Sequence, residues 1–232
     1  MREIVFDTET TGLNPIGGDR MVEIGCVEMC NRVETGRHFH AYFNPERLMP
    51  SEAEAVHGLT SIFLSDKPLF SEKAEELLDF IEDSPLIAHN AGFDFGFLNF
   101  ELERCGRPTV CTRRMVDTLQ LARTRHPGAK HSLDALCMRF GIDRSHRVKH
   151  GALLDAQLLA QVYVELTGGR QIGLGLVAEA GSVSIPSSAG PVTIREPRPA
   201  RPHFAGEEEL ARHRAFISRL TNPLWAQFAT AG

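Results

Sequence analysis

The stretch Ile4-Val5-Phe6-Asp7-Thr8-Glu9-Thr10-Thr11-Gly12 decides the fold, because an apolar run ends in two alternating acidic residues. The apolar run indicates a buried strand, and the alternation of side chains along a strand directs Asp7 and Glu9 to one face. Two like charges buried side by side are costly unless a cation lies between them. Oxygen ligands favour Mg²⁺ or Mn²⁺. The alternative interpretation is that the pair only begins a solvated loop.

A further acidic residue follows a short apolar strand in Leu86-Ile87-Ala88-His89-Asn90-Ala91-Gly92-Phe93-Asp94. The residues after it form an amphipathic pattern, so we expect Asp94 at the start of a helix. Its ordinary role there would be to stabilise the helix dipole, by about 0.3 to 1 kcal/mol. The other interpretation is that Asp94 joins the first acidic pair as a ligand.

A third segment, His150-Gly151-Ala152-Leu153-Leu154-Asp155, leads into a helix. Asp155 shares a face of this helix with the apolar residues at positions 158, 159, 162 and 166. A carboxylate on a face that packs against the core needs a partner. The alternative is a polar residue at the edge of the apolar face, and His89 and Asp94 show the same spacing.

Together, these three segments closely resemble the three exonuclease motifs of the DEDD superfamily, in its histidine-bearing branch, over about the first 170 residues. The resemblance implies an α/β, ribonuclease H-like exonuclease fold, with a mixed sheet flanked by helices, and 3′ to 5′ exonuclease activity. It also implies that Asp7, Glu9, Asp94 and Asp155 hold two divalent cations, Mg²⁺ or Mn²⁺. His150 would be the general base, since an imidazole titrates near neutral pH.

The same resemblance implies contacts with DNA 3′ ends, either single-stranded or frayed. His57 lies in Ala55-Val56-His57-Gly58-Leu59-Thr60, which resembles a family segment that runs along the terminal nucleotide of the substrate. His89 precedes the second motif, and we expect both histidines to be substrate neighbours rather than catalysts. The expected substrate-binding residues are Asp7, Glu9, Thr10, His57, His89, Asn90 and Asp155.

Composition is typical of an intracellular globular enzyme, with 232 residues, a hydrophobic fraction of 42% and a net charge of -5. No segment reaches the about 18 apolar residues of a membrane span, and the first expected strand begins at about residue 3, which leaves no room for the apolar region of a signal peptide. We therefore expect a cytoplasmic protein, and the family resemblance implies a bacterial one. The five cysteines form no CxxC pair, so we expect core residues rather than disulfides or a zinc site.

Positive charge is concentrated between residues 104 and 149, where eleven Lys or Arg accompany three acidic residues. One interpretation is a solvated helical face. The other is a rim that attracts phosphates near His150 and makes binding sensitive to salt.

The order of expected elements supports the same fold. We expect strands at residues 3–7, 21–29 and 37–44, helices through 51–83, a strand at 85–89 and mainly helix to residue 167. The first three strands would form an antiparallel meander before the chain returns to a parallel neighbour of the first. Helix ends are expected at Gly106, Gly141 and Gly168-Gly169.

Beyond an exonuclease domain of residues 1–170, residues 171–203 have the Gly, Ser and Pro content of a flexible linker. Residues 204–232 would form a short amphipathic helix that opens at Glu207-Glu208-Glu209 and is stopped by Asn222-Pro223. Such a helix cannot form its own core, so we expect it to dock on another surface. The alternative is that it packs back on the exonuclease domain.

This flexible C-terminal tail is similar to that of polymerase-associated proofreading members of the family, in which a last segment binds the polymerase subunit. The implied polymerase-binding residues are Leu210, Ile217, Leu220 and Trp225. The peptide Gln171-Ile172-Gly173-Leu174-Gly175-Leu176 is also similar to a sliding-clamp peptide, with Gln171, Leu174 and Leu176 as anchors, or it is plain linker. Two other functions remain open, a free-standing exonuclease that trims RNA or oligonucleotides and a non-catalytic polymerase scaffold.

Overall fold

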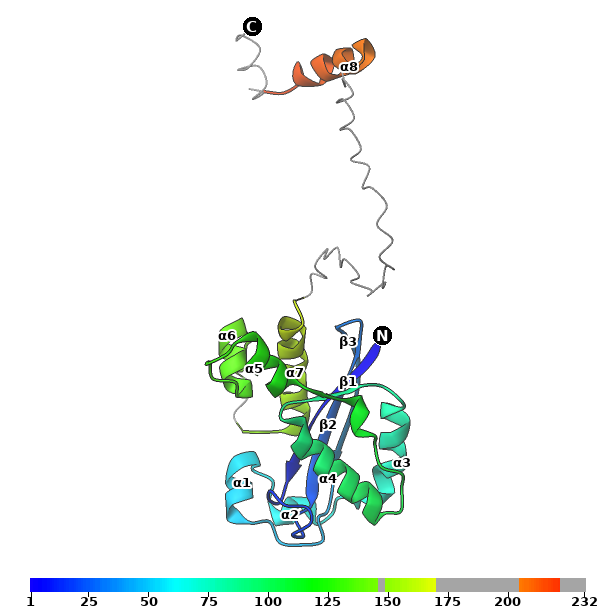
Figure 1. Ribbon diagram of the computed structural model, residues 1–232, viewed down its shortest axis with the longest axis vertical. Coiled ribbons are helices and arrows are strands. Elements are labelled where there is room, and N and C mark those ends of the chain that lie inside the picture. Colours follow the sequence, from blue (N-terminus) through cyan, green and yellow to red (C-terminus); the bar gives the residue numbers. More distant parts are fainter. Residues whose placement is uncertain (146–148, 170–204, 222–232) are drawn as a thin grey trace, which may run out of the picture. The chain divides into compact units, whose positions relative to one another are not determined.

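The computed structural model describes residues 1–145, 149–169 and 205–221. Contacts within the chain divide it into two units, which are treated separately below. The first unit contains a five-stranded mixed sheet in the order β3-β2-β1-β4-β5 (Figure 1). Its strands are β1 (Arg2–Thr10), β2 (Met21–Cys30), β3 (Val33–Tyr42), β4 (Leu86–Ala88) and β5 (Met115–Asp117).

The expected topology is confirmed. Strands β1, β2 and β3 form an antiparallel meander, and β4 returns parallel to β1. The expectation that mainly helix follows β4 is confirmed, but it did not include β5, which pairs parallel to β4. Because β5 has only three residues, it shows no alternation in the sequence, and its strand geometry depends on the hydrogen bonds to β4.

The helices of this unit are mostly short. They are α1 (Ser51–His57), α2 (Ser61–Leu64), α3 (Phe70–Ile81), α4 (Ala91–Arg104), α5 (Thr118–Arg125), α6 (Leu133–Phe140) and α7 (Ala152–Leu166), with a 3₁₀ turn at Thr112–Arg114. Helix α6 ends at Gly141 in the left-handed conformation, as expected. Gly106 follows the end of α4, and Gly168 follows the end of α7, so those two expected ends are also confirmed.

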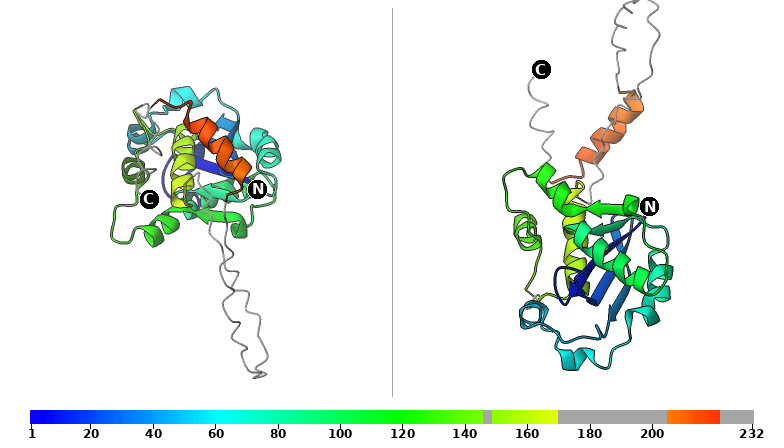
Figure 2. Two further views of the ribbon diagram at one scale, coloured as in Figure 1. Left: turned by 90° about the horizontal axis from the view of Figure 1, so that it is seen from above. Right: turned by 60° about the horizontal axis from the view of Figure 1, so that its bottom comes forward.

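Alternation along β1 divides the core between the two faces of the sheet. Ile4 and Phe6 pack into a large cluster with residues of α3 and α4, such as Leu77 and Phe97. Val5 packs on the other face with residues of α7, among them Leu159. The sheet is therefore covered by α7 on one face and by α3 and α4 on the other (Figure 2). Asp7 and Glu9 have the same parity as Val5, which places them on the α7 face.

Cysteines follow the expectation only in part. Cys26 and Cys137 are buried in the core, whereas Cys30 and Cys111 are exposed, which the expectation of core residues did not foresee. Cys30 is the last residue of its strand and Cys111 lies in a loop, so neither position is covered by packed elements. None of the five cysteines forms a disulfide bond.

The second unit contains α8 (Glu207–Ile217), whose first turn carries three glutamates as expected. The Gly206 N–H donates to Glu209 Oε2 over 2.9 Å and so caps the helix. Helix α8 ends at Ile217, five residues before Asn222, so Leu220 lies beyond the end of the helix. The expected linker, the clamp peptide, Arg147 and Trp225 lie outside the described residues. Within the described parts of the chain, every helix is too short or too polar to span a membrane.

Candidate active site

Four carboxylates from three elements gather at the carboxyl end of β1. Asp7 and Glu9 come from β1, Asp94 from the first turn of α4 and Asp155 from the first turn of α7. Ligand atoms of Glu9, Asp155 and His150 all lie within 4.8 Å of one another. The Thr8 hydroxyl donates to Asp94 Oδ1 over 2.7 Å. Thr8, which lies between Asp7 and Glu9, therefore holds the side chain of Asp94 in place. The structure thus brings all five expected catalytic and metal-binding residues to one end of the sheet.

The electrostatics of this cluster favour a bound cation. Burial raises the pKa of Asp7 well above its usual range, and the charges of Asp94, Glu9 and Asp155 raise it further. Burial also raises the pKa of Asp94 to about 7. The burial of both carboxylates, together with the neighbouring charges that act on Asp7, makes full ionisation of the cluster unfavourable. A group of oxygen ligands whose charges repel one another fits Mg²⁺ or Mn²⁺.

His150 lies at the solvent edge of the cluster. Its side chain is 48% exposed, and its Nδ1 is 3.2 Å from Asp155 Oδ2. A carboxylate beside Nδ1 favours the tautomer that carries a proton there, which leaves the lone pair on Nε2. The ring is therefore oriented, open to water and able to accept a proton.

Gly25 allows α7 to approach the sheet at this point. It pairs with Asp7 across β1 and β2. A Cβ atom on Gly25 would lie 2.3 Å from both N and Cα of Leu153, which is backbone at the start of α7. Any larger residue at this position would push away the helix that carries Asp155. Sequence reasoning did not identify Gly25, because the glycine lies inside an otherwise ordinary strand pattern.

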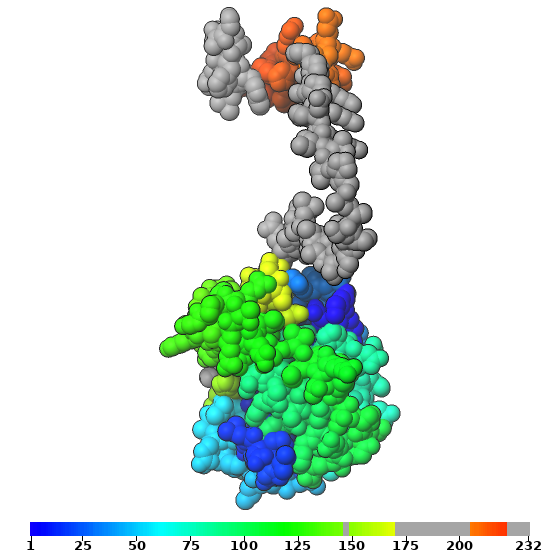
Figure 3. Space-filling view, viewed as in Figure 1, coloured from blue at the N-terminus to red at the C-terminus, as the bar shows by residue number. Residues whose placement is uncertain are grey.

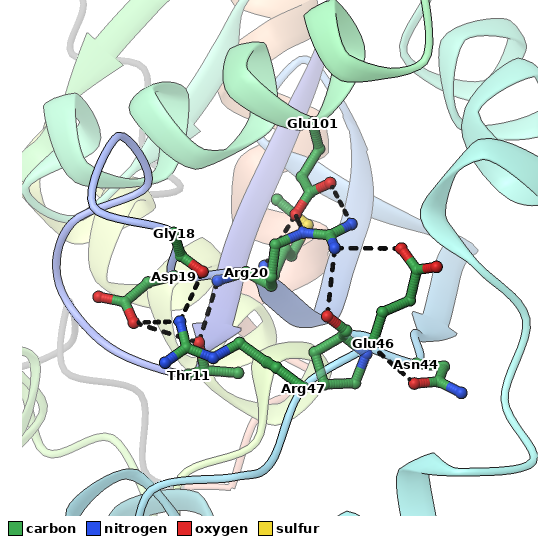
Figure 4. A network of polar contacts seen from close by, with 10 residues as sticks. Thr11, Gly18, Asp19, Arg20, Asn44, Glu46, Arg47 and Glu101 are labelled. Carbon is green, nitrogen blue, oxygen red and sulfur yellow. Dashed lines mark hydrogen bonds and ion pairs between the residues drawn. The ribbon is translucent and has the colours of Figure 1, made fainter.

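A second cluster of charges connects the loop after β1 to α4 (Figure 4). Arg20 donates through Nε and Nη2 to the two carboxylate oxygens of Glu101, over 2.7 and 2.9 Å. The same guanidinium donates to the Pro45 carbonyl and to Glu46 Oε2. Hydrogen bonds to Glu101 raise the pKa of Arg20. Glu101 belongs to the helix that carries Asp94, so this pair joins the first and second motifs.

The loop itself is braced by Asp19 and Arg47. Asp19 accepts from the Asn14 N–H over 3.0 Å and from Arg47 Nη1 over 2.9 Å. Arg47 also donates to the Gly18 carbonyl. The Arg20 N–H donates to the Thr11 hydroxyl, which closes the loop at the end of β1. The loop therefore has a fixed shape next to Glu9.

A cavity of about 400 Å³ opens between this loop and α1. Figure 3 shows the two segments side by side at the surface, the loop in blue and α1 in cyan. Leu13, Val56 and Phe93 contribute apolar side chains to the cavity. Its lining residues are Thr8, Glu9, Thr10, Thr11, Gly12, Leu13, Pro50, Glu52, Ala53, Val56, His57 and Phe93.

His57 lines this cavity as a neutral donor. Burial lowers the pKa of its imidazole. Its Nδ1 accepts from the Leu59 N–H over 3.0 Å, so the proton of the neutral ring is on Nε2. His57 Nε2 is buried and forms no hydrogen bond of good geometry among the described residues, although the Thr10 backbone lies close enough to raise the pKa of the ring. A buried donor of this kind indicates a place for a ligand acceptor.

The remaining expected substrate residues are placed differently. Thr10 is buried beside the cavity, where its hydroxyl donates to the Gly12 carbonyl. Asn90 precedes α4 in the left-handed conformation and donates its N–H to Asp117. His89 Nδ1 lies 2.9 Å from the hydroxyl of Thr118, at the start of α5, and burial lowers its pKa. His89 therefore contacts α5, whereas His150 contacts Asp155.

Glu23 is a further buried carboxylate that sequence reasoning missed. It pairs with Glu9 across β1 and β2 and adds to the charges that raise the pKa of Asp7. His40 Nε2 lies 2.7 Å from Glu23 Oε1. The signal in the sequence is a glutamate inside the apolar run Met21-Val22-Glu23-Ile24. Only the pairing register shows that it faces the active site.

Part of the basic segment is engaged in ordinary surface contacts. Arg107 pairs with Glu75 and Arg144 with Asp134. Arg114 donates to the Ser84 carbonyl over 2.9 Å. These residues support the interpretation of a solvated face for their part of the segment, and the phosphate-attracting rim stays a prediction for the others.

Comparison with known proteins agrees with the geometry. Residues 4–163 match the family model of the RNase T exonucleases. Among solved structures, exonuclease X in complex with 5′ overhanging duplex DNA is similar with a TM-score of 0.54 and 25% identity, over 71% of this chain and 90% of that one. The zinc-bound complex of Escherichia coli ExoI with single-stranded DNA shares the fold, with a TM-score of 0.63 and 19% identity over 73% of this chain and 41% of that one.

Curated relatives are more similar in sequence and span more than nine tenths of the chain. The DNA polymerase III subunit epsilon of Rickettsia conorii is 48% identical over 223 residues, which are 95% of this chain and 96% of the relative. The Escherichia coli subunit of the same name is 45% identical, over 92% of this chain and 91% of the relative.

The fold and the acidic site define a metal-dependent 3′ to 5′ exonuclease of the DEDD class. Within that class, this chain belongs to the family of DNA polymerase III epsilon subunits, the proofreading exonucleases.

Proposed function

We propose that this chain removes mismatched 3′-terminal nucleotides of DNA as 5′-monophosphates, with two divalent cations held by Asp7, Glu9, Asp94 and Asp155. The observation that carries the proposal is the convergence of buried carboxylates from β1, α4 and α7 at the carboxyl end of β1, where burial and neighbouring charges raise the pKa of Asp7. Mg²⁺ or Mn²⁺ bound there would neutralise the carboxylates and the phosphodiester and would stabilise the charge that develops on the reacting oxygens.

His150 acts as the general base. It accepts a proton on Nε2 from the water that attacks the phosphorus, while Asp155 beside Nδ1 holds the ring and stabilises the imidazolium. The bond from phosphorus to the 3′ oxygen of the preceding nucleotide breaks in the same displacement. No covalent enzyme intermediate is required.

The cavity beside Glu9 binds the terminal nucleotide. Leu13, Val56 and Phe93 contact the base through apolar surface, and the N–H of His57 Nε2 donates to a polar atom of the nucleotide. None of these contacts needs to read the identity of the base. A mismatched terminus costs less to unpair than a matched one, so the unpairing of the primer end distinguishes mismatched from matched termini.

Nucleotide release from primers tests this proposal. We expect the wild-type protein with Mg²⁺ to remove the terminal nucleotide of a 3′-mismatched DNA primer, and excess chelator to abolish the reaction. A matched RNA oligonucleotide serves as the competing substrate. Preference for RNA would support a free-standing trimming enzyme, and activity that survives the chelator would reject the metal mechanism. Lack of activity on both substrates would favour a non-catalytic scaffold.

The C-terminal unit binds the alpha subunit of polymerase III in this proposal. Leu210 and Leu220 are exposed apolar residues, and Ile217 is half-buried at the end of α8. A helix that leaves apolar side chains in water gains stability when a partner covers them. Trp225 and the clamp peptide anchored by Gln171, Leu174 and Leu176 complete the proposed contacts with the polymerase and the sliding clamp.

Deletion of residues 171–232 tests the partner assignment. We expect the truncated chain to keep its metal-dependent exonuclease activity and to lose binding to the alpha subunit. A chain with Leu210→Ser and Ile217→Ser is the subtler variant, since it keeps the full length. Unchanged alpha binding by the truncated chain would reject the role of the tail.

A further inference from the structure

Lys149 directly precedes His150, and its side chain lies against the residue that ends α1. That residue is Gly58, which caps α1 in the left-handed conformation with φ of 77°. A Cβ atom on Gly58 would lie 2.7 Å from Cδ and 2.9 Å from Nζ of Lys149. The end of the lysine side chain therefore occupies space that exists only because residue 58 has no side chain.

The ammonium group is held there without a carboxylate. Among the described residues Lys149 forms no ion pair, unlike Arg107 and Arg144 in the same basic segment. A lysine on an exposed loop normally keeps its full rotational freedom, and fixing it costs side-chain entropy. Contact with Gly58 restricts Lys149 in advance. A ligand that binds the ammonium group therefore has less side-chain entropy to remove.

Lys149 lies beside the wall of the substrate cavity, because Gly58 directly follows His57, a lining residue. Burial lowers the pKa of His57, and the charge of Lys149 lowers it further. Figure 1 shows the chain entering α7 beside α1, which brings the third motif to the wall of the cavity.

We propose that Lys149 binds a backbone phosphate of the single strand, the one on the 5′ side of the phosphate that is cleaved. The inference rests on the proposed function, because it requires the scissile phosphate to lie at the carboxylates. A neighbouring phosphate then lies outside the metal site and needs a protein cation. Lys149 supplies one at the junction of α1 and the third motif.

This role gives a specific dependence on salt. Each phosphate contact with a single strand contributes about −0.7 to the slope of log affinity against log salt. Loss of Lys149 should make the slope of log KM against log salt concentration less steep by about 0.7. A hydrogen bond to a charged group contributes about 1.5 kcal/mol or more, so KM should rise about tenfold or more at low salt.

The test compares two substrates of the full-length protein with Mg²⁺. One is a single-stranded DNA oligonucleotide, and the other is the p-nitrophenyl ester of a nucleoside 5′-monophosphate, which has only the scissile phosphate. Lys149→Gln should raise KM for the oligonucleotide about tenfold more than KM for the ester. Lys149→Arg should restore most of the loss. Arg107→Gln, which removes an exposed arginine that pairs with Glu75 on α3, should leave the salt slope unchanged.

Two results would overturn the inference. An equal rise in KM for the ester would mean that Lys149 contacts the scissile phosphate or is needed for folding. An unchanged salt slope in Lys149→Gln would show that Lys149 binds no phosphate. If the wild-type protein hydrolyses neither substrate, the proposed function fails instead, so the two failures are distinguishable.

Discussion

Two groups of charged side chains join β1 to α4, and they differ in how their charges are balanced. In the first, Asp7 lies among Asp94, Glu9 and Asp155, and its pKa is raised. In the second, Glu101 receives two hydrogen bonds from Arg20, and Asp19 pairs with Arg47. The first group opposes its own ionisation, whereas the second stabilises ionised residues.

The carboxylates of the first group carry the proposed chemistry, and the ion pairs of the second group hold the surrounding backbone in place. A cluster of like charges is expensive in a folded protein unless a cation or a substrate shares the site. A bidentate arginine and carboxylate pair fixes geometry without needing a ligand. Arg20 and Glu101 therefore hold the loop after β1 against α4, while the carboxylates at the end of β1 remain available for cations.

The largest expected effect is on turnover. His150→Ala should lower kcat by about 10²- to 10⁴-fold, because the general base is lost. His89→Ala should lower it less, since His89 contacts Thr118 rather than Asp155. Single-turnover release of the terminal nucleotide measures both. The reverse ranking of the two variants would show that the base is assigned to the wrong histidine.

The next effect is on stability and concerns the balanced group. Glu101→Gln leaves the buried Arg20 guanidinium without its ionic partner and should lower the free energy of unfolding by about 3 to 5 kcal/mol. Glu46, whose side chain is 52% exposed, contacts the same guanidinium over 3.3 Å. Glu46→Gln is the matched control and should cost about 0 to 1 kcal/mol. Urea unfolding of the metal-free proteins measures both.

Equal losses in these two variants would mean that burial does not distinguish the two contacts of Arg20. A double variant, Arg20→Met with Glu101→Leu, sharpens the result. It removes both charges and should recover much of the stability that Glu101→Gln loses.

The smallest expected effect is the pH dependence of the metal-free protein. The pKa of Asp94 is raised from an ordinary 3.8 to about 7 in the folded state. Between these values the folded state binds more protons than the unfolded state, so the contribution of Asp94 to stability falls as pH rises. The melting temperature should fall less steeply from pH 5 to pH 8 in Asp94→Asn than in the wild type. An equal fall of the melting temperature with pH in both proteins would contradict the raised pKa of Asp94.

The sequence predicted the acidic residues because each follows an apolar strand or begins a helix. It also predicted the antiparallel meander and the parallel return, since those strands have clear alternation. It could not predict Arg20 with Glu101, because the two are far apart in the sequence and each is an ordinary surface residue by type. Gly25 and the contact between Lys149 and Gly58 depend on how closely two elements approach, which no local pattern encodes.

Calorimetric titration of Mn²⁺ into the wild type, Asp7→Asn and Asp19→Asn tests the central claim most directly. Both variants replace one carboxylate by an amide, Asp7 in β1 and Asp19 in the loop after it, but only Asp7 belongs to the group with raised pKa values. The account predicts Mn²⁺ binding in the wild type and in Asp19→Asn, and strongly weakened binding in Asp7→Asn. Equal binding by all three proteins would contradict it.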